Sequence, residues 1–285
     1  MTTIVIAAHN EAAVIGRCLD ALLADHDPDL EIIVVPNGCT DETAELARSR
    51  GVRVVDVASA GKAMALNAGD AVATSFPRIY LDADIAVPPG GIHALVAALA
   101  RTGSPVAVPR RRLALRGRPR LVRAYFSINA RLPVFSRGLF GRGLVALSEE
   151  GRRRFDSFPP IVADDLFLDS LFADSERTIV DAVEVVVETP LTAHDLISVL
   201  ARVRRGNAAV RALGDAKIRQ ARRWSWLWDV VLRDPRLAPA AVVYVTLSVV
   251  AVLRARRTDR FSLAWGRDES TRPSERQSQP RPECR

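Results

Sequence analysis

Hydrophobic and polar positions alternate in blocks along the first third of the chain. Short, continuous apolar runs are typical of strands that are buried on both faces. The strands that these runs predict are 3–8, 30–36, 52–57 and 78–84. The helices predicted between them, from apolar residues at helical spacing, are 11–23, 40–50, 61–73 and 90–101. This alternation predicts an α/β fold with a mostly parallel central sheet and helices on both of its faces.

A second series of elements follows in the next part of the chain. The pattern predicts a short strand leading into a helix at 143–151, a helix at 159–172, a strand at 178–189 and a helix at 192–210. We therefore expect one domain over 1–215, with a first half at 1–100 and a second half at 101–215. No internal repeat is visible.

The region between the two series is rich in arginine. Residues 101–154 contain 14 Arg against two Glu, with hydrophobic residues interleaved. This pattern fits a solvated basic connector, and it also fits contact with phosphate groups or an anionic membrane surface. No nucleic-acid motif accompanies the charge, so we do not expect nucleic acid as a partner.

An uncharged stretch near the carboxyl terminus, 237–253, predicts an apolar helix. As a helix it would measure roughly 25 Å, against about 30 Å of bilayer hydrocarbon. Arginines flank it on both sides, and Trp224, Trp226 and Trp228 precede it. A buried helix, a short membrane span and an interfacial or re-entrant helix all fit this pattern. We predict a membrane-associated segment over 216–262 and a disordered tail over 263–285.

Cysteine usage and the amino-terminal residues indicate the cellular compartment. The formal net charge is +7. Cys18, Cys39 and Cys284 have neither metal-ligand nor disulfide spacing, which favours a reducing compartment without a structural metal. Residues 1–11 lack the basic and apolar regions of a signal peptide and lead directly into a strand, so we expect the first domain on the cytoplasmic side.

Polar residues gather where the predicted parallel strands end. His9, Asn10 and Glu11 follow the first strand, and Asp82 and Asp84 follow the fourth. Ligands of such sheets bind beyond the carboxyl ends of the strands. Two carboxylates two residues apart face the same way from an extended backbone, and they repel each other unless a cation lies between them. A hard divalent cation with oxygen ligands is the obvious candidate.

Two common nucleotide-binding classes are disfavoured because their glycine-rich loops are missing. The first strand is not followed by Gly-x-Gly-x-x-Gly, and no phosphate-binding loop ends in Lys-Ser or Lys-Thr. The motifs that are present, in chain order, are IVIAAHNEAAVI, VVPNGCTDET, GKAMALNAG, YLDAD, GRGLVALSEEG, VADDLFL and RVRRGN. In this order they resemble the family 2 glycosyltransferases, which have the A-type nucleotide-sugar fold, from about residue 3 to residue 210.

The resemblance implies a nucleotide-sugar site. The turn at Ala8 to Glu11 would contact the nucleoside, and Asn37 would face the base where many relatives have an Asp. The donor-binding residues that the resemblance implies are Ala8, Asn10, Glu11, Asn37, Lys62, Asp82, Asp84, Arg204 and Arg205. Simpler roles fit some of them, including a helix N-cap for Asn10, a solvated lysine and a solvated basic helix face.

The resemblance also implies the chemistry. Asp84 would coordinate Mg²⁺ or Mn²⁺ at the diphosphate, and His194 could be a further metal ligand, a diphosphate donor or a polar cap. Asp165 would be the base that deprotonates the acceptor hydroxyl, and Asp164 would orient it or cap the helix. The sugar would be transferred with inversion of configuration. Gly206 stands where processive relatives carry a Trp after the arginine, which weakens any expectation of polymer synthesis.

The function expected from the sequence is a metal-dependent, inverting glycosyltransferase at the cytoplasmic membrane face. Its donor would be a UDP-sugar, with a GDP-sugar as the second choice, and its acceptor a sugar or a lipid-linked hydroxyl. A nucleotidyltransferase on a similar sheet is one alternative, although the loop after the first strand is not glycine-rich. A non-catalytic membrane adaptor is another, although Asp84 and Asp165 are both retained.

Overall fold

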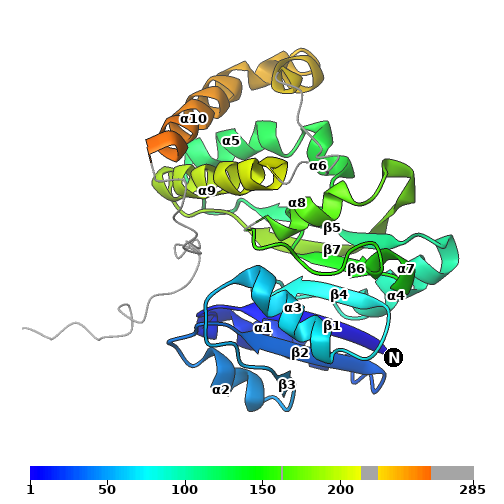
Figure 1. The fold of residues 1–285 in the computed structure, drawn as a ribbon. Helices are drawn as coiled ribbons and strands as arrows, with labels where there is room; N and C mark the ends of the chain where they lie inside the picture. Colours follow the sequence, from blue (N-terminus) through cyan, green and yellow to red (C-terminus); the bar gives the residue numbers. More distant parts are fainter. Residues whose placement is uncertain (162, 213–223, 258–285) are drawn as a thin grey trace, which may run out of the picture.

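A seven-stranded sheet forms the centre of the molecule, in the order β3-β2-β1-β4-β6-β5-β7 (Figure 1). The structure is a computed structural model that describes residues 1–161, 163–212 and 224–257. The strands are β1 (Thr2–Ala8), β2 (Leu30–Pro36), β3 (Arg53–Val54), β4 (Arg78–Asp82), β5 (Val106–Ala114), β6 (Leu144–Leu147) and β7 (Arg177–Glu188). The predicted tail at 263–285 lies outside the described residues.

Helices cover both faces of this sheet. In the first half they are α1 (Ala12–Leu23), α2 (Thr43–Arg48), α3 (Lys62–Val72) and α4 (Gly91–Thr102). In the second half they are α5 (Arg120–Asn129), α6 (Pro133–Arg137), α7 (Glu149–Arg152), α8 (Asp164–Ser170), α9 (Ala193–Ala212) and α10 (Ala238–Arg257). Short helical turns lie at Asp174–Glu176, Trp226–Val231 and Pro235–Leu237.

The strand directions confirm the predicted, mostly parallel α/β class. β1 pairs parallel with β2 and β4, and β5 pairs parallel with β7. β6 is the exception, since it runs antiparallel to both β4 and β5. It therefore begins at the edge of the sheet where β4 ends, and it brings the second half of the chain to that edge.

Two hydrophobic clusters, one on each face of the sheet, explain the continuous apolar runs. Successive residues of a strand point to opposite faces. Ile4 and Ile6 of β1 therefore pack in the cluster that includes α1 and α4, whereas Val5 packs in the cluster that includes α3 and α8. All three side chains are fully buried. The central strands of the first half, β1, β2 and β4, thus need apolar residues at both odd and even positions.

β5 was not predicted, because its sequence does not look like a buried strand. Pro109 and three consecutive arginines follow its first apolar residues. The structure shows that arginines of this region pair with acids of β7: Arg112 Nε lies 2.7 Å from Glu184, and Arg118 Nη2 lies 2.6 Å from Glu188. Residues 101–154 are thus more than a connector, since they form β5, α5 (Arg120–Asn129) and β6, although most of their arginines are exposed to solvent as expected.

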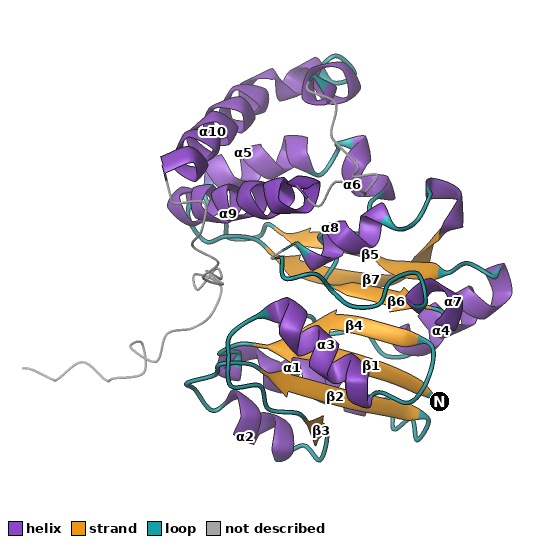
Figure 2. Ribbon diagram, in the orientation of Figure 1, coloured by secondary structure: helices purple, strands orange, loops and turns teal. Residues whose placement is uncertain are grey.

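The apolar helix predicted near the carboxyl terminus is present as α10. It packs along α5 and α9 (Figure 2). Tyr125 of α5 and Tyr244 of α10 stack with ring centroids 5.0 Å apart. Within the described residues, Pro235–Arg256 is the one helical segment long and apolar enough to cross a membrane, with a mean hydropathy of 1.9. Length and composition alone do not distinguish a span from a core helix.

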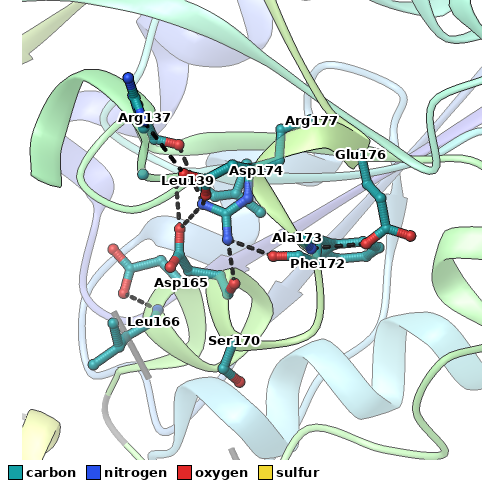
Figure 3. Close-up of polar contacts among 12 residues, drawn as sticks. Arg137, Leu139, Asp165, Leu166, Ser170, Phe172, Ala173, Asp174, Glu176 and Arg177 are labelled. Carbon is teal, nitrogen blue, oxygen red and sulfur yellow. Dashed lines mark hydrogen bonds and ion pairs between the residues drawn. The ribbon is translucent and has the colours of Figure 1, made fainter. Parts of the chain in front are cut away.

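A buried ion pair fixes α8 against the sheet. Asp169 in α8 accepts hydrogen bonds from Arg177, the first residue of β7, and from the backbone N–H of Leu139 at 2.8 Å. Arg177 also donates to the carbonyl oxygen of Phe172 at 2.6 Å (Figure 3). Asp169 is 1% exposed. Since α8 begins with Asp164, this pair determines where the acidic residues at the start of the helix lie.

We predict that Asp169→Ala destabilises the protein by about 3–5 kcal/mol, because it leaves the guanidinium of Arg177 buried without its counter-charge. Urea unfolding measures the change. Asp181→Ala is the matched control, since Asp181 is 83% exposed and lies 3.7 Å from Arg110, and it should cost less than about 1 kcal/mol. Equal effects of the two variants would contradict this account.

Candidate active site at the carboxyl edge of the sheet

The ammonium group of Lys62 lies between two carboxylates from distant parts of the chain. Its Nζ is 2.7 Å from Oδ1 of Asp82 and 2.9 Å from Oδ2 of Asp164. Lys62 begins α3, Asp82 ends β4 and Asp164 begins α8. Burial alone would lower the pKa of Lys62, but Asp164 and Asp82 raise it above its ordinary value. The lysine therefore stays charged and joins the two halves of the predicted domain.

A glycine allows the loop before β6 to approach Asp82 closely. Gly143 has φ of +68°, and a Cβ at this position would lie 2.5 Å from Ile85 Cγ1 and 3.2 Å from Oδ2 of Asp82. The backbone N–H of Asp82 donates to the carbonyl oxygen of Gly143 at 2.8 Å. A side chain at this position would fill the space beside the carboxylate of Asp82. This steric constraint explains why the motif has a glycine at position 143.

Asp165 is held by two backbone donors. The N–H of Gly141 donates to its Oδ2 at 2.9 Å. The N–H of Leu166 donates to its Oδ1 at 2.8 Å (Figure 3). Burial raises the pKa of Asp165, and it raises the pKa of Asp164 to about 6, although Lys62 opposes the shift at both residues. The geometry places two partly desolvated acids side by side at the start of α8, next to the lysine.

Asn37 connects the loops that end the first two parallel strands. Its Nδ2 donates to the carbonyl oxygen of Ala8 at 2.8 Å, and its Oδ1 accepts from the N–H of Gly61 at 3.0 Å. The side chain is fully buried. Both the nitrogen and the oxygen of the side-chain amide are thus hydrogen-bonded to backbone groups. A residue that contacts a nucleotide base was expected to have this amide available to the ligand.

The turn after β1 is tied to the next loop in the same way. Asn10 has φ of 51°, and its Oδ1 accepts from the N–H of Thr40 at 2.7 Å. The N–H of Glu11 donates to Oγ1 of Thr43 at 2.7 Å. Glu11, not Asn10, occupies the N-cap position of α1, and its own side chain makes no capping hydrogen bond. The first N–H of the helix, that of Ala12, instead donates to Oδ2 of Asp41 at 3.1 Å. The simple explanation of Asn10 as an N-cap was therefore wrong.

Asp84 lies two residues beyond the end of β4, in the first half of the domain. Its carbonyl oxygen accepts from Nη2 of Arg17 at 3.3 Å. Burial raises the pKa of Cys18 to about 12, and the charges of Asp84 and Asp82 add to that shift, which places both carboxylates near the thiol. Whether Asp84 binds a metal stays a prediction.

The predicted site residues of α9 lie among the carboxyl-terminal helices. Nε2 of His194 is 3.3 Å from Nη1 of Arg254 in α10, which disfavours a role as a metal ligand. Arg204 lies near Tyr125 and Tyr244. Burial raises the pKa of both phenols, and the charge of Arg204 opposes this shift. Arg205 is only half-buried, in the next position of the helix. The contacts shown for His194 and Arg204 are thus with α5 and α10.

A divalent cation could be bound here jointly by the protein and a ligand. Within the described ranges, no group of three or more His, Cys, Asp or Glu side chains could hold a metal ion. Asp84 offers hard oxygen ligands next to Asp82, at the edge where a diphosphate would lie. Mg²⁺ is commonly bound in this way, by one or two carboxylates and by phosphate oxygens of the substrate. The residues present fit this kind of site.

Comparison with known proteins identifies the family. The model of glycosyl transferase family 2 matches residues 3–150, which is more than half of the 285 residues. The chain therefore belongs to glycosyl transferase family 2. A 4,4'-diaponeurosporenoate glycosyltransferase of Staphylococcus aureus is 38% identical over 89 residues, covering 29% of this chain and 24% of that protein. The match thus spans only a small part of this curated relative.

Solved structures with the same fold are also glycosyltransferases. A mannosyltransferase from Pyrobaculum calidifontis in complex with GDP-Man and Mn²⁺ is similar over 90% of this chain and 76% of its own, with a TM-score of 0.59 and 20% identity. Glucosyl-3-phosphoglycerate synthase from Mycobacterium tuberculosis, in complex with Mn²⁺ and UDP, covers 74% of this chain and 79% of its own, with a TM-score of 0.54 and 21% identity. At these identities the likeness shows the fold.

We predict that Asp164→Asn changes how stability depends on pH. The folded state binds the proton of Asp164 more tightly than the unfolded chain does, because the pKa is raised from an ordinary value near 3.8 to about 6. Lowering the pH from 7 to 5 therefore favours the folded state through this residue. The variant lacks this effect, so its stability relative to wild type should be greater at pH 7 than at pH 5, by on the order of 1–3 kcal/mol.

Urea unfolding at the two pH values, in EDTA, measures this difference. Asp29→Asn is the control, because Asp29 is exposed in the loop before β2. A relative stability of Asp164→Asn that is the same at both pH values would show that Asp164 is not protonated more readily in the folded state.

Proposed function

We propose that this chain is a metal-dependent, inverting glycosyltransferase that moves a sugar from a nucleotide-sugar donor to an acceptor hydroxyl. The observation that supports this most is the placement of Lys62 between Asp82 and Asp164. It puts the acid that ends β4 and the acids that begin α8 around one position at the carboxyl edge of the sheet. The motifs of both halves thus form a single site rather than two separate helix ends.

The donor half would bind the nucleoside diphosphate. Asp82 would accept hydrogen bonds from the ribose, and the ammonium of Lys62 would bind a diphosphate oxygen. When bound beside Asp84, a divalent cation supplies positive charge to the leaving diphosphate. The neighbouring structures that contain GDP-Man or UDP together with Mn²⁺ support this assignment of the ligand class. UDP is the nucleotide we favour.

The acceptor half would supply the base. Asp165 takes the proton from the acceptor hydroxyl while that oxygen attacks the anomeric carbon, and the nucleoside diphosphate leaves from the opposite face of the sugar. A single displacement of this kind inverts the configuration. The two backbone donors to Asp165 fix the direction of its carboxylate, and a base held in this way needs no rearrangement as it accepts the proton.

Calorimetry of the full chain with UDP, GDP and dTDP, each in Mn²⁺ and in EDTA, tests the donor half. We expect one nucleotide to bind in a metal-dependent way, and Asp84→Asn to weaken that binding at least tenfold. Asp29→Asn is the matched control, because Asp29 belongs to one of the two other Asp-x-Asp sequences, at 27–29, and is exposed. Absence of binding by any of the nucleotides to the folded protein would falsify the donor assignment and favour a non-catalytic adaptor.

Transfer itself tests the acceptor half. Asp165→Asn should keep the donor affinity and lower the rate of sugar transfer by roughly 10²–10⁴, because it removes the base but keeps the shape of the side chain. Sugar transfer is followed from the labelled nucleotide sugar to a membrane extract that serves as the acceptor pool. Nucleotidyl transfer in the same assay would instead support the alternative enzyme class.

We also propose that α10 lies in the plane of the cytoplasmic membrane surface, beside a lipid-linked acceptor. One face of the helix packs on α5 and α9, so α10 is not separated from the domain as an independent span would be. Its opposite face is apolar and exposed at Val242, Val249, Val250 and Leu253. Exposed arginines at both ends suit anionic headgroups, namely Arg233, Arg236, Arg254 and Arg256.

We predict that Val249→Asp lowers binding to vesicles that contain anionic lipid by at least tenfold, because a charge then enters the apolar face. Flotation with vesicles of phosphatidylcholine, with and without phosphatidylglycerol, measures the binding. Ala97→Asp places the same charge on an exposed position of α4 and should bind like wild type. Equal flotation of both variants would rule out the outer face of α10 as the membrane contact.

A further inference from the structure

Arg111 of β5 lies beside the loop that holds the proposed base, and the sequence motifs did not identify it. Its Nη1 donates to the carbonyl oxygen of Gly141 at 3.3 Å. Its guanidinium lies over the ring of Phe135, 4.5 Å from the centroid. The ring of Phe135 in turn meets the edge of Phe140, with centroids 5.5 Å apart. The aromatic contacts keep the guanidinium in place under the glycine-rich loop.

The peptide groups at Gly141 connect this arginine to Asp165. The carbonyl oxygen of Gly141 accepts from Arg111, and its N–H donates to Oδ2 of Asp165 at 2.9 Å. Gly141 has φ of +68°, and a Cβ at this position would lie 2.8 Å from Nη1 of Arg111. The glycine therefore allows the close approach that lets one residue bond to both side chains.

The charges around Asp165 come from several elements. Lys62 of α3 is a cation, and Asp82 of β4 and Asp164 of α8 itself are acids. Arg111 is the further cation from β5: burial and the charge of Arg142 lower its pKa to about 10, and the charge of Asp165 opposes that shift. Arg111 therefore remains positively charged at neutral pH and lies close enough to act on Asp165.

A second arginine lies in the same region but is used differently. Arg142 is buried, and it donates to the backbone carbonyl oxygens of Pro109, Phe135, Ser136 and Gly138. In contrast, Nη2 of Arg111 is buried and has no hydrogen-bond partner among the residues that the structure describes. Nε of Arg177, the structural partner of Asp169, is likewise buried without a hydrogen-bond partner among the described residues. What distinguishes Arg111 is therefore its contact with the loop that holds Asp165.

We propose that Arg111 is a positioning residue: it holds the Gly141 peptide against the carboxylate of Asp165 and supplies the positive charge that keeps this carboxylate ionised. The inference rests on the proposed function, in which Asp165 is the base. It adds a residue from β5 to a site that otherwise consists of the edge of the first half and the start of α8. Arg111 itself does not touch the substrate.

Arg111→Met and Arg111→Lys separate the two roles. Methionine keeps the packing on Phe135 but removes the charge and the donors, whereas lysine keeps the charge but loses the fork of the guanidinium. Arg112→Met is the matched control, because Arg112 is the next residue of β5 and its side chain is 59% exposed. If Arg111→Met does not fold, Arg111→Gln replaces it.

The first readout needs no catalytic activity. Titration of the ¹³C-labelled carboxyl groups by NMR, in EDTA and without donor, follows Asp165, whose signal is assigned from its loss in Asp165→Asn. We expect Arg111→Met to raise the midpoint of this titration by about 1 pH unit, since an opposite charge nearby favours the ionised form. Arg111→Lys should shift it less, and Arg112→Met should leave it as in wild type.

The second readout is the pH profile of transfer. In Arg111→Met, the acid limb of kcat/KM should move to higher pH by a similar amount, kcat should fall about tenfold at neutral pH, and the donor Kd should not change. An unchanged NMR midpoint and an unchanged acid limb in Arg111→Met would show that Arg111 only stabilises the fold. Absence of transfer by wild type would reject the proposed function, while the NMR titration would still decide whether Arg111 acts on Asp165.

Discussion

The structure depends on one cation in a cluster of acids. Asp82, Asp164 and Asp165 converge at the carboxyl edge of the sheet, and Lys62 bonds to two of them. Three carboxylates at this distance repel each other, and the repulsion grows as water is excluded. Without the ammonium, the start of α8 and the end of β4 would be pushed apart. The contact between the two halves of the site is thus electrostatic, and the sheet supplies the frame that makes it possible.

That frame has two features that the apolar patterns do not reveal. β6 runs antiparallel beside β4, so the glycine-rich loop that precedes β6 ends next to Asp82. The buried pair of Asp169 and Arg177 then sets the position of α8. Such a pair contributes little net stability compared with apolar packing, but it accepts only one arrangement of its partners. It therefore selects where the acids of α8 lie.

The first half of the fold could be predicted because burial on both faces leaves a clear pattern, as Ile4, Val5 and Ile6 show. β5 could not, since its arginine Arg112 pairs with Glu184 of β7, which is 72 residues away in sequence. The same limit applies at the site. The motifs located Asp82, Asp164 and Asp165, but only the structure shows that Asn37 is occupied by backbone groups. Side-chain partners that depend on tertiary structure have no local signal.

The raised pKa of Asp164 and Asp165 gives a physical reason for the arginine under the loop. A base must be ionised at the working pH, yet burial and the neighbouring acids favour the protonated form. The ammonium of Lys62 already pairs with Asp82 and Asp164, and a diphosphate bound in the site would compete with these carboxylates for it. When that happens, Asp165 needs a cation that the donor cannot reach. Arg111, shielded behind Gly141, is placed to fill that role among the described residues, which is why its charge matters most when the donor is bound.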